Sequence, residues 1–280
     1  MIKIHDFSFQ YEGSKNFALK NINMEIADGD FVGIIGGSGA GKTTLAHSMC
    51  AVIPQYRHGD FYGTVSVDGM DTVDTEPEKI SRIAGCVMQD IDAQLTTSVV
   101  EDEILFGLEN FSVPADEAEE RIRWALESAG ISDLRYRTFD SLSGGQKQKA
   151  AICAVTALKP KLLILDEPTG ELDPQSSIRI FEMLRYLNEN LGVTIVVVEQ
   201  KIMLLCEYAK KLTVVENGQL LKFGGVREVL KDVEELKRTG VSCPRVTDVS
   251  HALEKRGLYT GPAAVTVADA EKIVKGVCRR

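Results

Sequence analysis

The sequence lacks any apolar run long enough to cross a membrane. A membrane-spanning helix needs about 20 consecutive apolar residues, and the most apolar run here, VTIVVV at 193–198, has only the length of a strand. The first residues, MIKIHDFSFQYEG, have no apolar segment after a basic start and so do not resemble a secretory signal. We therefore expect a soluble chain, and any membrane path that it serves must come from other proteins.

Cysteine and histidine are too scattered to predict a metal site. The six cysteines form no CxxC pair, and the four histidines show no ligand spacing. We expect free thiols in a reducing compartment and histidines with ordinary surface or core roles, although His58 lies in an expected loop where a partner could touch it. These residues are Cys50, Cys86, Cys153, Cys206, Cys243 and Cys278, and His5, His47, His58 and His251.

Basic residues are outnumbered by acidic ones. The 32 Lys and Arg against 41 Asp and Glu give a formal net charge of −9. Nucleic-acid binding draws on a basic surface that attracts phosphates, so this composition argues against a general nucleic-acid binder. A local basic patch would still be compatible with it.

Short apolar runs alternate with helical patterns, which predicts a doubly wound α/β core. Several runs are continuously hydrophobic, as is typical of strands buried on both faces of a parallel sheet. Asn217-Gly218 predicts a hairpin within 212–223. The expected strands are 31–36, 64–69, 83–88, 161–166 and 193–198, and the expected helices lie near 42–52, 98–108, 115–129, 144–157 and 174–190.

Two regions depart from this alternation. Residues from about 90 to 156 are mostly helical and predict a helical subdomain inserted into the core. After residue 225 two short amphipathic patterns follow, separated by proline and glycine, and they predict a small helical C-terminal appendage. The expected division is a main domain of residues 1–225 and an appendage of residues 226–280.

The segment GGSGAGKTT fits the phosphate-loop pattern GxxxxGK[ST] in full. It follows an expected strand and opens an expected helix, the context that the motif requires. Its glycines let successive backbone N–H groups point into one cavity and bind phosphate oxygens, together with the helix N-terminus. Lys42 is placed to reach the β- and γ-phosphates and Thr43 to bind Mg²⁺. The candidate residues are Gly36, Gly37, Ser38, Gly39, Ala40, Gly41, Lys42, Thr43 and Thr44.

Two acidic residues follow the apolar run LLIL and give a second sign of nucleotide chemistry. Asp166, at the end of that expected strand, is placed to hold the Mg²⁺ shell, because Mg²⁺ prefers carboxylates and water. Glu167, one residue on, is placed to polarise an attacking water. An acidic turn at a strand end is the simpler alternative, but the preceding phosphate loop favours the catalytic interpretation.

LSGGQKQK, at 142–149, completes a set of three motifs that resembles the ABC ATPases over most of residues 1–225. The resemblance implies a P-loop NTPase core with a parallel sheet, an antiparallel β portion and an inserted helical subdomain. It also implies two subunits that sandwich two ATP molecules. Ser143, Gly144, Gly145 and Gln146 would face the γ-phosphate bound to the other subunit, from a helix N-terminus. Loss of that phosphate by hydrolysis would then open the dimer.

Three further residues match positions of this family. Tyr11 matches the aromatic that stacks on adenine, although a core tyrosine would also fit. Gln89, in CVMQD, matches the glutamine that contacts Mg²⁺ or water. Asp173, in GELD, matches the loop that crosses the dimer interface.

A narrower resemblance lies in residues 89–110 and in the tail REVLKDVEELKRTGVSCPRVTDVSHALEKRG. Both resemble the energy-coupling-factor (ECF) type of ABC ATPase, and residues 53–69 are similar to ECF ATPases that occur as tandem fusions. This implies a peripheral protein at the cytoplasmic face of the membrane. Its partners would be a second ATPase, a transmembrane coupling protein and a substrate-capture membrane protein for a vitamin or a transition-metal ion.

Gln200 departs from the family pattern, because a histidine usually stands at this position. A glutamine amide can donate a hydrogen bond but cannot carry positive charge or shuttle a proton. We therefore expect slow hydrolysis at this chain's own phosphate loop. The alternatives are that glutamine substitutes well or that a neighbouring group compensates. The substitution mildly favours a heterodimer, because a homodimer would carry it twice.

Other functions remain open at this point. The chain fits an ATPase of another ABC transporter class less closely. ABC proteins of DNA repair, chromosome structure or translation carry long insertions or two cassettes, and this sequence has neither feature. A simple P-loop kinase would not need LSGGQ.

Overall fold

Six strands form the central sheet of the molecule, and this computed structural model describes residues 1–278. In spatial order they are β10 (Gln219–Gly225), β9 (Lys211–Glu216), β3 (Phe31–Ile35), β8 (Thr194–Val198), β7 (Leu162–Asp166) and β6 (Ala84–Val87). All neighbours pair in parallel except β10, which pairs antiparallel with β9. Every residue of β3, β7 and β8 is buried, as a parallel sheet covered on both faces requires.

A smaller antiparallel sheet packs on one face of the central sheet. Its order is β2 (Leu19–Ile26), β1 (Ile2–Tyr11), β4 (Gly59–Val67) and β5 (Met70–Asp71). Inward residues of this sheet, such as Ile22 and Val65, share one apolar cluster with Ile34 and Val196 of the central sheet. The two sheets confirm the predicted α/β class with a parallel sheet and an antiparallel portion.

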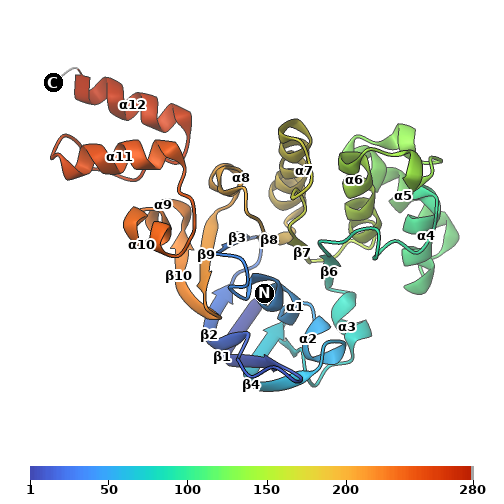
Figure 1. Cartoon of the computed structure of the whole chain (residues 1–280). Helices are drawn as coiled ribbons and strands as arrows, with labels where there is room; N and C mark the ends of the chain where they lie inside the picture. The colour runs from blue at the N-terminus through green and yellow to red at the C-terminus, as the bar shows by residue number, and fades with distance from the viewer. Residues whose placement is uncertain (279–280) are drawn as a thin grey trace.

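Helices cover the remaining surfaces of the two sheets. In Figure 1, α7 and α8 lie above the central sheet, α4 to α6 stand at one end of the molecule, and α9 to α12 lie at the opposite end. The helices of residues 42–208 are α1 (Lys42–Ser48), α2 (Val52–Gln55), α3 (Pro77–Ser81), α4 (Val100–Asn110), α5 (Ala115–Ala129), α6 (Gly144–Thr156), α7 (Pro174–Leu191) and α8 (Ile202–Tyr208), with 3-10 turns η1 (Ser132–Leu134) and η2 (Phe139–Ser141). After β10 follow α9 (Val226–Val229), α10 (Val233–Arg238), α11 (Arg245–Lys255) and α12 (Val267–Cys278).

Helices α4, α5 and α6 occupy the region for which a helical subdomain is predicted. Arg135 connects α4 and α5, because its guanidinium contacts Glu101 of α4 at 2.9 Å and Glu119 of α5 at 2.5 Å. These two carboxylates raise the pKa of Arg135 above its usual range, the bond to Glu119 being the larger cause. The division of the chain at residues 225 and 226 stays a prediction.

The local predictions agree with the structure where side-chain periodicity alone decides. The helix expected at 115–129 has those bounds, and the 217–218 turn has Asn217 at φ 50° and Gly218 at φ 77°. The helix expected at 42–52 is too long, because α1 ends at Ser48 and Ala51 turns the chain at φ 59°. The strand expected at 64–69 begins earlier, at Gly59.

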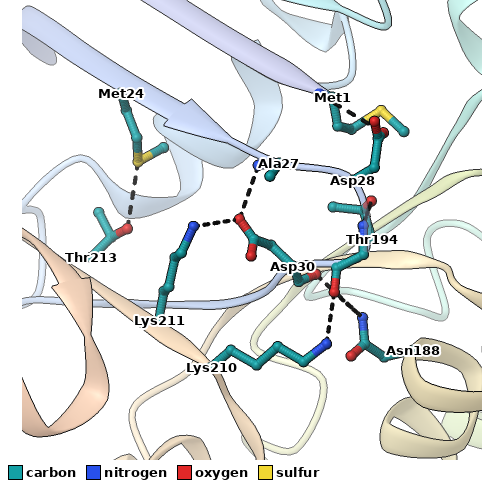
Figure 2. A network of polar contacts seen from close by, with 11 residues as sticks. Met1, Met24, Ala27, Asp28, Asp30, Asn188, Thr194, Lys210, Lys211 and Thr213 are labelled. Atoms are coloured by element: carbon teal, nitrogen blue, oxygen red, sulfur yellow. Dashed lines mark hydrogen bonds and ion pairs between the residues drawn. The ribbon is translucent and has the colours of Figure 1, made fainter.

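A polar network fixes the connection between the two sheets. The Asp30 carboxylate, at the start of β3, accepts from the backbone N–H of Ala27 at 2.9 Å and from Lys211 Nζ at 2.7 Å (Figure 2). Around it, the carbonyl of Gly29 accepts from Asn188 and Lys210, and the N–H of Gly29 donates to Thr194 Oγ1. One loop is thereby bonded to β8, β9 and α7 at once.

Asp30→Ala should lower the free energy of unfolding by about 2 kcal/mol, because it leaves a backbone N–H and an ammonium without their shared acceptor. Asp28→Ala is the matched control. Asp28 is 79% exposed, and its carboxylate lies 3.8 Å from the N-terminal ammonium, so its loss should change stability by less than about 0.5 kcal/mol. Urea unfolding of both variants measures the difference. Equal midpoints would show that the network contributes nothing.

Candidate functional site

Four neighbouring strands of the central sheet end at the same edge and bring the candidate residues together. The phosphate loop follows β3, Gln89 follows β6, Glu167 follows β7 and Gln200 follows β8. The carboxyl ends of parallel strands are where α/β proteins bind ligands. A cavity of about 410 Å³ lies there, and its lining consists of Tyr11, Ala18, Ser38, Gly39, Ala40, Gly41, Lys42, Thr43, Thr44, Gln89, Glu167 and Gln200.

Glycine is required at two positions of the phosphate loop because other backbone lies against them. A Cβ on Gly36 would stand 2.2 Å from the Val215 carbonyl oxygen of β9. Gly41 has φ +104°, and its Cβ would stand 2.6 Å from the Ala18 carbonyl oxygen. The loop is therefore wedged between the central sheet and the start of β2.

Lys42 and Tyr11 both contact the phosphate loop or its helix. The Lys42 ammonium donates to the carbonyl oxygens of Gly36 at 3.1 Å and Gly37 at 2.9 Å, so it lies over the loop whose N–H groups form the cradle. The Tyr11 hydroxyl lies 3.0 Å from Thr44 Oγ1, and its ring packs edge-on against Phe9. Tyr11 is therefore half in the core and half in the cavity wall.

Asp166 supplies a buried oxygen that has no partner within the protein. Its side chain is 2% exposed, and Oδ1 lacks a hydrogen bond. Burial raises the pKa of Asp166, while a hydrogen bond from Thr43 opposes the shift. An unpartnered carboxylate oxygen beside a phosphate-loop hydroxyl is the donor set that fits a hard divalent cation. Within residues 1–278 no group of three or more His, Cys, Asp and Glu side chains could hold a metal, so any ion here would need ligand oxygens from elsewhere.

Glu167 is held in place by two amides. Its Oε1 accepts from Gln200 Nε2 at 2.8 Å, and its Oε2 accepts from Gln89 Nε2 at 3.4 Å. The backbone of Glu167 is left-handed, with φ 49°, and its N–H donates to the Val198 carbonyl. Such a conformation is costly for a residue with a side chain and is characteristic of functional sites.

The signature residues lie away from this cavity. Ser143 and Gln146 form a capping box at the start of α6, in which each side chain bonds to the other residue's backbone N–H. Ser143, Gly145 and Gln146 line a separate cavity of about 210 Å³, and Gly144 lines a third together with Glu167 and Gln89. None of the four signature residues is among the residues that line the cavity at the phosphate loop.

Asp173 also lies outside the cavity and caps a helix. Its carboxylate accepts from the N–H groups of Gln175 at 2.9 Å and Ser176 at 3.0 Å, at the start of α7. The bonds from Ser176 are the main cause of its lowered pKa. Its predicted place at a dimer interface stays a prediction.

The residue before Gln200 is one that sequence reasoning missed. Glu199 is 1% exposed, yet its Oε2 accepts from the Thr169 hydroxyl at 2.5 Å. Its Oε1 accepts from the backbone N–H groups of Gln200 at 2.8 Å and Lys201 at 3.0 Å. A glutamate directly after the four apolar residues that end β8 was the available signal, because a buried carboxylate needs such partners.

Two further expectations concern cysteines and histidines. All six cysteines are free thiols, as predicted. His47, in α1, is 2% exposed, and neither ring nitrogen has a hydrogen-bond partner. Burial, reinforced by the charge of Arg57, lowers the pKa of His47 to about 4, so it is a neutral core histidine.

Across the described part of the chain no helix is both long and apolar enough to span a bilayer.

Known proteins resemble this chain over most of its length. The sequence profile of the family described as "ABC transporter" matches residues 19–170. The energy-coupling factor transporter ATP-binding protein EcfA1 of Caldanaerobacter subterraneus is 34% identical over 283 residues, which cover 100% of this chain and 99% of that protein.

Solved structures agree with this match. cbiO1 from Clostridium perfringens, described as part of the ABC transporter complex cbiONQ, has a TM-score of 0.75 and 31% identity, covering 91% of this chain and 98% of that one. The ATP-binding cassette MJ0796, a dimer in a post-hydrolysis state bound to ADP and Pi, has a TM-score of 0.71 and 26% identity, covering 81% and 99%.

Gly41→Ala should lower the free energy of unfolding by about 2 kcal/mol, because alanine is strained at this φ and its Cβ meets a carbonyl oxygen. Gly37→Ala is the control within the same loop, since the nearest atom to its Cβ would be the Thr239 carbonyl oxygen at 3.4 Å. Thermal unfolding of the two variants tests the difference. A control as unstable as Gly41→Ala would refute the steric explanation.

Proposed function

Because the chain belongs to the ABC transporter ATP-binding family, we propose that it is the ATP-hydrolysing subunit of an ECF-type importer and works as half of an ATPase dimer. One observation carries the proposal: the phosphate loop, Glu167, Gln89 and Gln200 meet at a single cavity. A loop that only turned the chain would have no need of a carboxylate held by two amides at its edge.

Different cavity residues bind different parts of the nucleotide. The phosphate-loop N–H groups and Lys42 bind the β- and γ-phosphates, and Tyr11 stacks on adenine. The Thr43 hydroxyl, the buried Asp166 and Gln89 would hold Mg²⁺, which would neutralise phosphate charge. The unpartnered Asp166 Oδ1 is the feature of this chain that supports that assignment.

Glu167 orients and polarises the attacking water. Its two amide partners hold the carboxylate in one position without adding charge. A positioned general base contributes about 10²–10⁴-fold to a rate. Gln200 holds this carboxylate as a histidine would, but its neutral amide supplies no positive charge to the transferring phosphate.

The position of the signature residues supports the proposal that a second subunit completes the site. Ser143, Gly144 and Gly145 lie at the start of α6 and line cavities other than the one at the phosphate loop. They therefore serve the nucleotide of a partner ATPase, either another copy of this chain or a related one. ATP favours the closed dimer because its γ-phosphate contacts both subunits, and hydrolysis removes that preference.

The transport path belongs to membrane partners. Named relatives include a transporter of the energy-coupling-factor type and a member of a cbiONQ complex. We place this chain at the cytoplasmic face of the membrane, bound to a transmembrane coupling protein and a substrate-capture protein. The substrate class is a vitamin or a transition-metal ion, and those partners select it.

Purification of the tagged chain from detergent-solubilised membranes tests the ECF assignment. We expect three companions, identified by mass spectrometry: an ATPase, a coupling protein and a compact substrate-capture membrane protein. A Lys42→Ala variant controls for dependence on the nucleotide site and should assemble without hydrolysing ATP. Recovery of the membrane domains of another ABC class in place of the substrate-capture protein would contradict the assignment.

Gln200→His should raise the rate of ATP hydrolysis by about 10-fold or more, because one missing transition-state donor costs about 10²–10³ in rate. Gln200→Ala removes the bond to Glu167 and should lower the rate further. Phosphate release by the assembled complex measures both. An unchanged rate for Gln200→His would mean that glutamine already performs the role of histidine.

A further inference from the structure

The residue after Gln200 makes three hydrogen bonds to the chain that follows Glu167. Lys201 Nζ donates to the carbonyl oxygens of Thr169 at 2.6 Å and Leu172 at 2.9 Å, and to Ser177 Oγ at 2.9 Å. An ammonium has three donors, and all three are used here. Thr169 and Leu172 belong to the connection between β7 and α7, and Ser177 lies near the start of α7.

The turn within this connection is also bonded to the start of α7, because the Asp173 carboxylate accepts from Gln175 and Ser176 and the Asp173 carbonyl accepts from Ser177 Oγ at 2.9 Å. In the turn, residues 170–173, the N–H of Gly170 donates to the Glu167 carbonyl at 3.2 Å and that of Leu172 to the Thr169 carbonyl at 3.1 Å. Gly170 and Glu171 are exposed, and Leu172 is half-buried. Of the three bonds from Lys201, the one to the Leu172 carbonyl reaches the turn itself, and those to Thr169 and Ser177 hold the chain on either side of it. All three are charge-assisted, which makes them stronger than bonds between neutral groups.

Glu199 and Lys201 hold the connection from two sides. The Glu199 carboxylate binds the Thr169 hydroxyl, whereas the Lys201 ammonium binds the Thr169 carbonyl. Gln200, between them, binds the Glu167 carboxylate. Three consecutive residues after β8 therefore contact the site residue, its connection to α7 and the start of α7.

We infer that Lys201 is a positioning residue that fixes the turn of residues 170–173 relative to Glu167 and the end of β8. The inference deepens the proposed function, because the turn is where we expect the second ATPase to pack. A turn held by Lys201 has one position when the partner arrives, so less conformational entropy is lost on closure. Because Gln200 and Lys201 are consecutive, a shift of the Gln200 backbone would also move Lys201 and hence the turn.

Hydrogen exchange in the full-length chain tests the positioning directly. Lys201→Met keeps the aliphatic stem and removes the three donors. Peptides covering 167–177 should exchange about 10-fold faster, as expected when local opening becomes easier by one hydrogen bond. Lys201→Arg should restore most of the protection. Lys210→Met is the matched control, because its ammonium also caps a carbonyl, that of Gly29, at a distant place.

Steady-state kinetics separates positioning from general damage. In the assembled complex Lys201→Met should lower kcat about 10-fold and leave KM for ATP within about twofold, since Lys201 is not among the residues that line the cavity at the phosphate loop. Lys201→Arg should recover kcat. Unchanged exchange at 167–177, or a rise in KM with unchanged kcat, would overturn the inference.

The two proposals fail in different ways. If the unmodified chain neither binds nor hydrolyses ATP, the proposed function is wrong, while the exchange experiment still decides whether Lys201 fixes the turn. If the unmodified complex hydrolyses ATP and Lys201→Met matches it in exchange and kcat, only the role of Lys201 is wrong. Should Lys201→Met fold poorly, Lys201→Gln, which keeps an amide donor without the charge, replaces it in both measurements.

Discussion

The parallel pairing of β6, β7, β8 and β3 is the constraint on which the site depends. Asp166 pairs with Val198, and Val198 pairs with Ile34, so three strands end level with one another. Their next residues emerge at one edge. A shift of two residues in any of these pairings would carry Glu167 or Gln200 roughly 7 Å away, which exceeds the reach of the amide–carboxylate bond between them.

The antiparallel sheet completes the cavity rather than merely covering the core. Ala18 leads into β2 and presses its carbonyl oxygen against Gly41, while Tyr11, at the end of β1, reaches Thr44. The phosphate loop is therefore shaped from outside as well as by its own glycines. The Asp30 network connects the antiparallel sheet to β8 and β9 (Figure 2). The two sheets are therefore also bonded to each other at the amino end of β3, opposite the cavity.

The parts that could be predicted from the sequence are those encoded locally. The phosphate loop is continuous in sequence, and Ser143 caps its own helix, so their patterns are visible without a fold. Strands β1 and β2 were harder to predict, because they lie at a half-buried sheet and do not form continuous apolar runs. The end of α1 depends on the left-handed Ala51, which no propensity favours.

The contacts of residues 199–201 lie beyond such reasoning for a different reason. Lys201 finds its acceptors 24 to 32 residues earlier in the chain, and carbonyl acceptors have no side-chain signature. A lysine after a strand is ordinarily a solvated residue. Only the folded backbone distinguishes this one, because the turn after β7 directs two carbonyls toward it. Glu199 is also distinguished only by the fold, because its carboxylate accepts from Thr169, which follows the neighbouring strand β7.

Gln200 shows how the site separates two tasks that a histidine combines. Holding Glu167 needs only a donor at hydrogen-bond distance, and the 2.8 Å contact provides it. Stabilising the developing charge needs a positive group, and a primary amide has none. In the proposed function, nucleotide binding and dimer closure draw on the phosphate loop and the signature residues, neither of which contains Gln200. On that proposal the substitution bears on the lifetime of the closed state, because that state would persist until the γ-phosphate is released, while its formation would depend on residues that this chain retains.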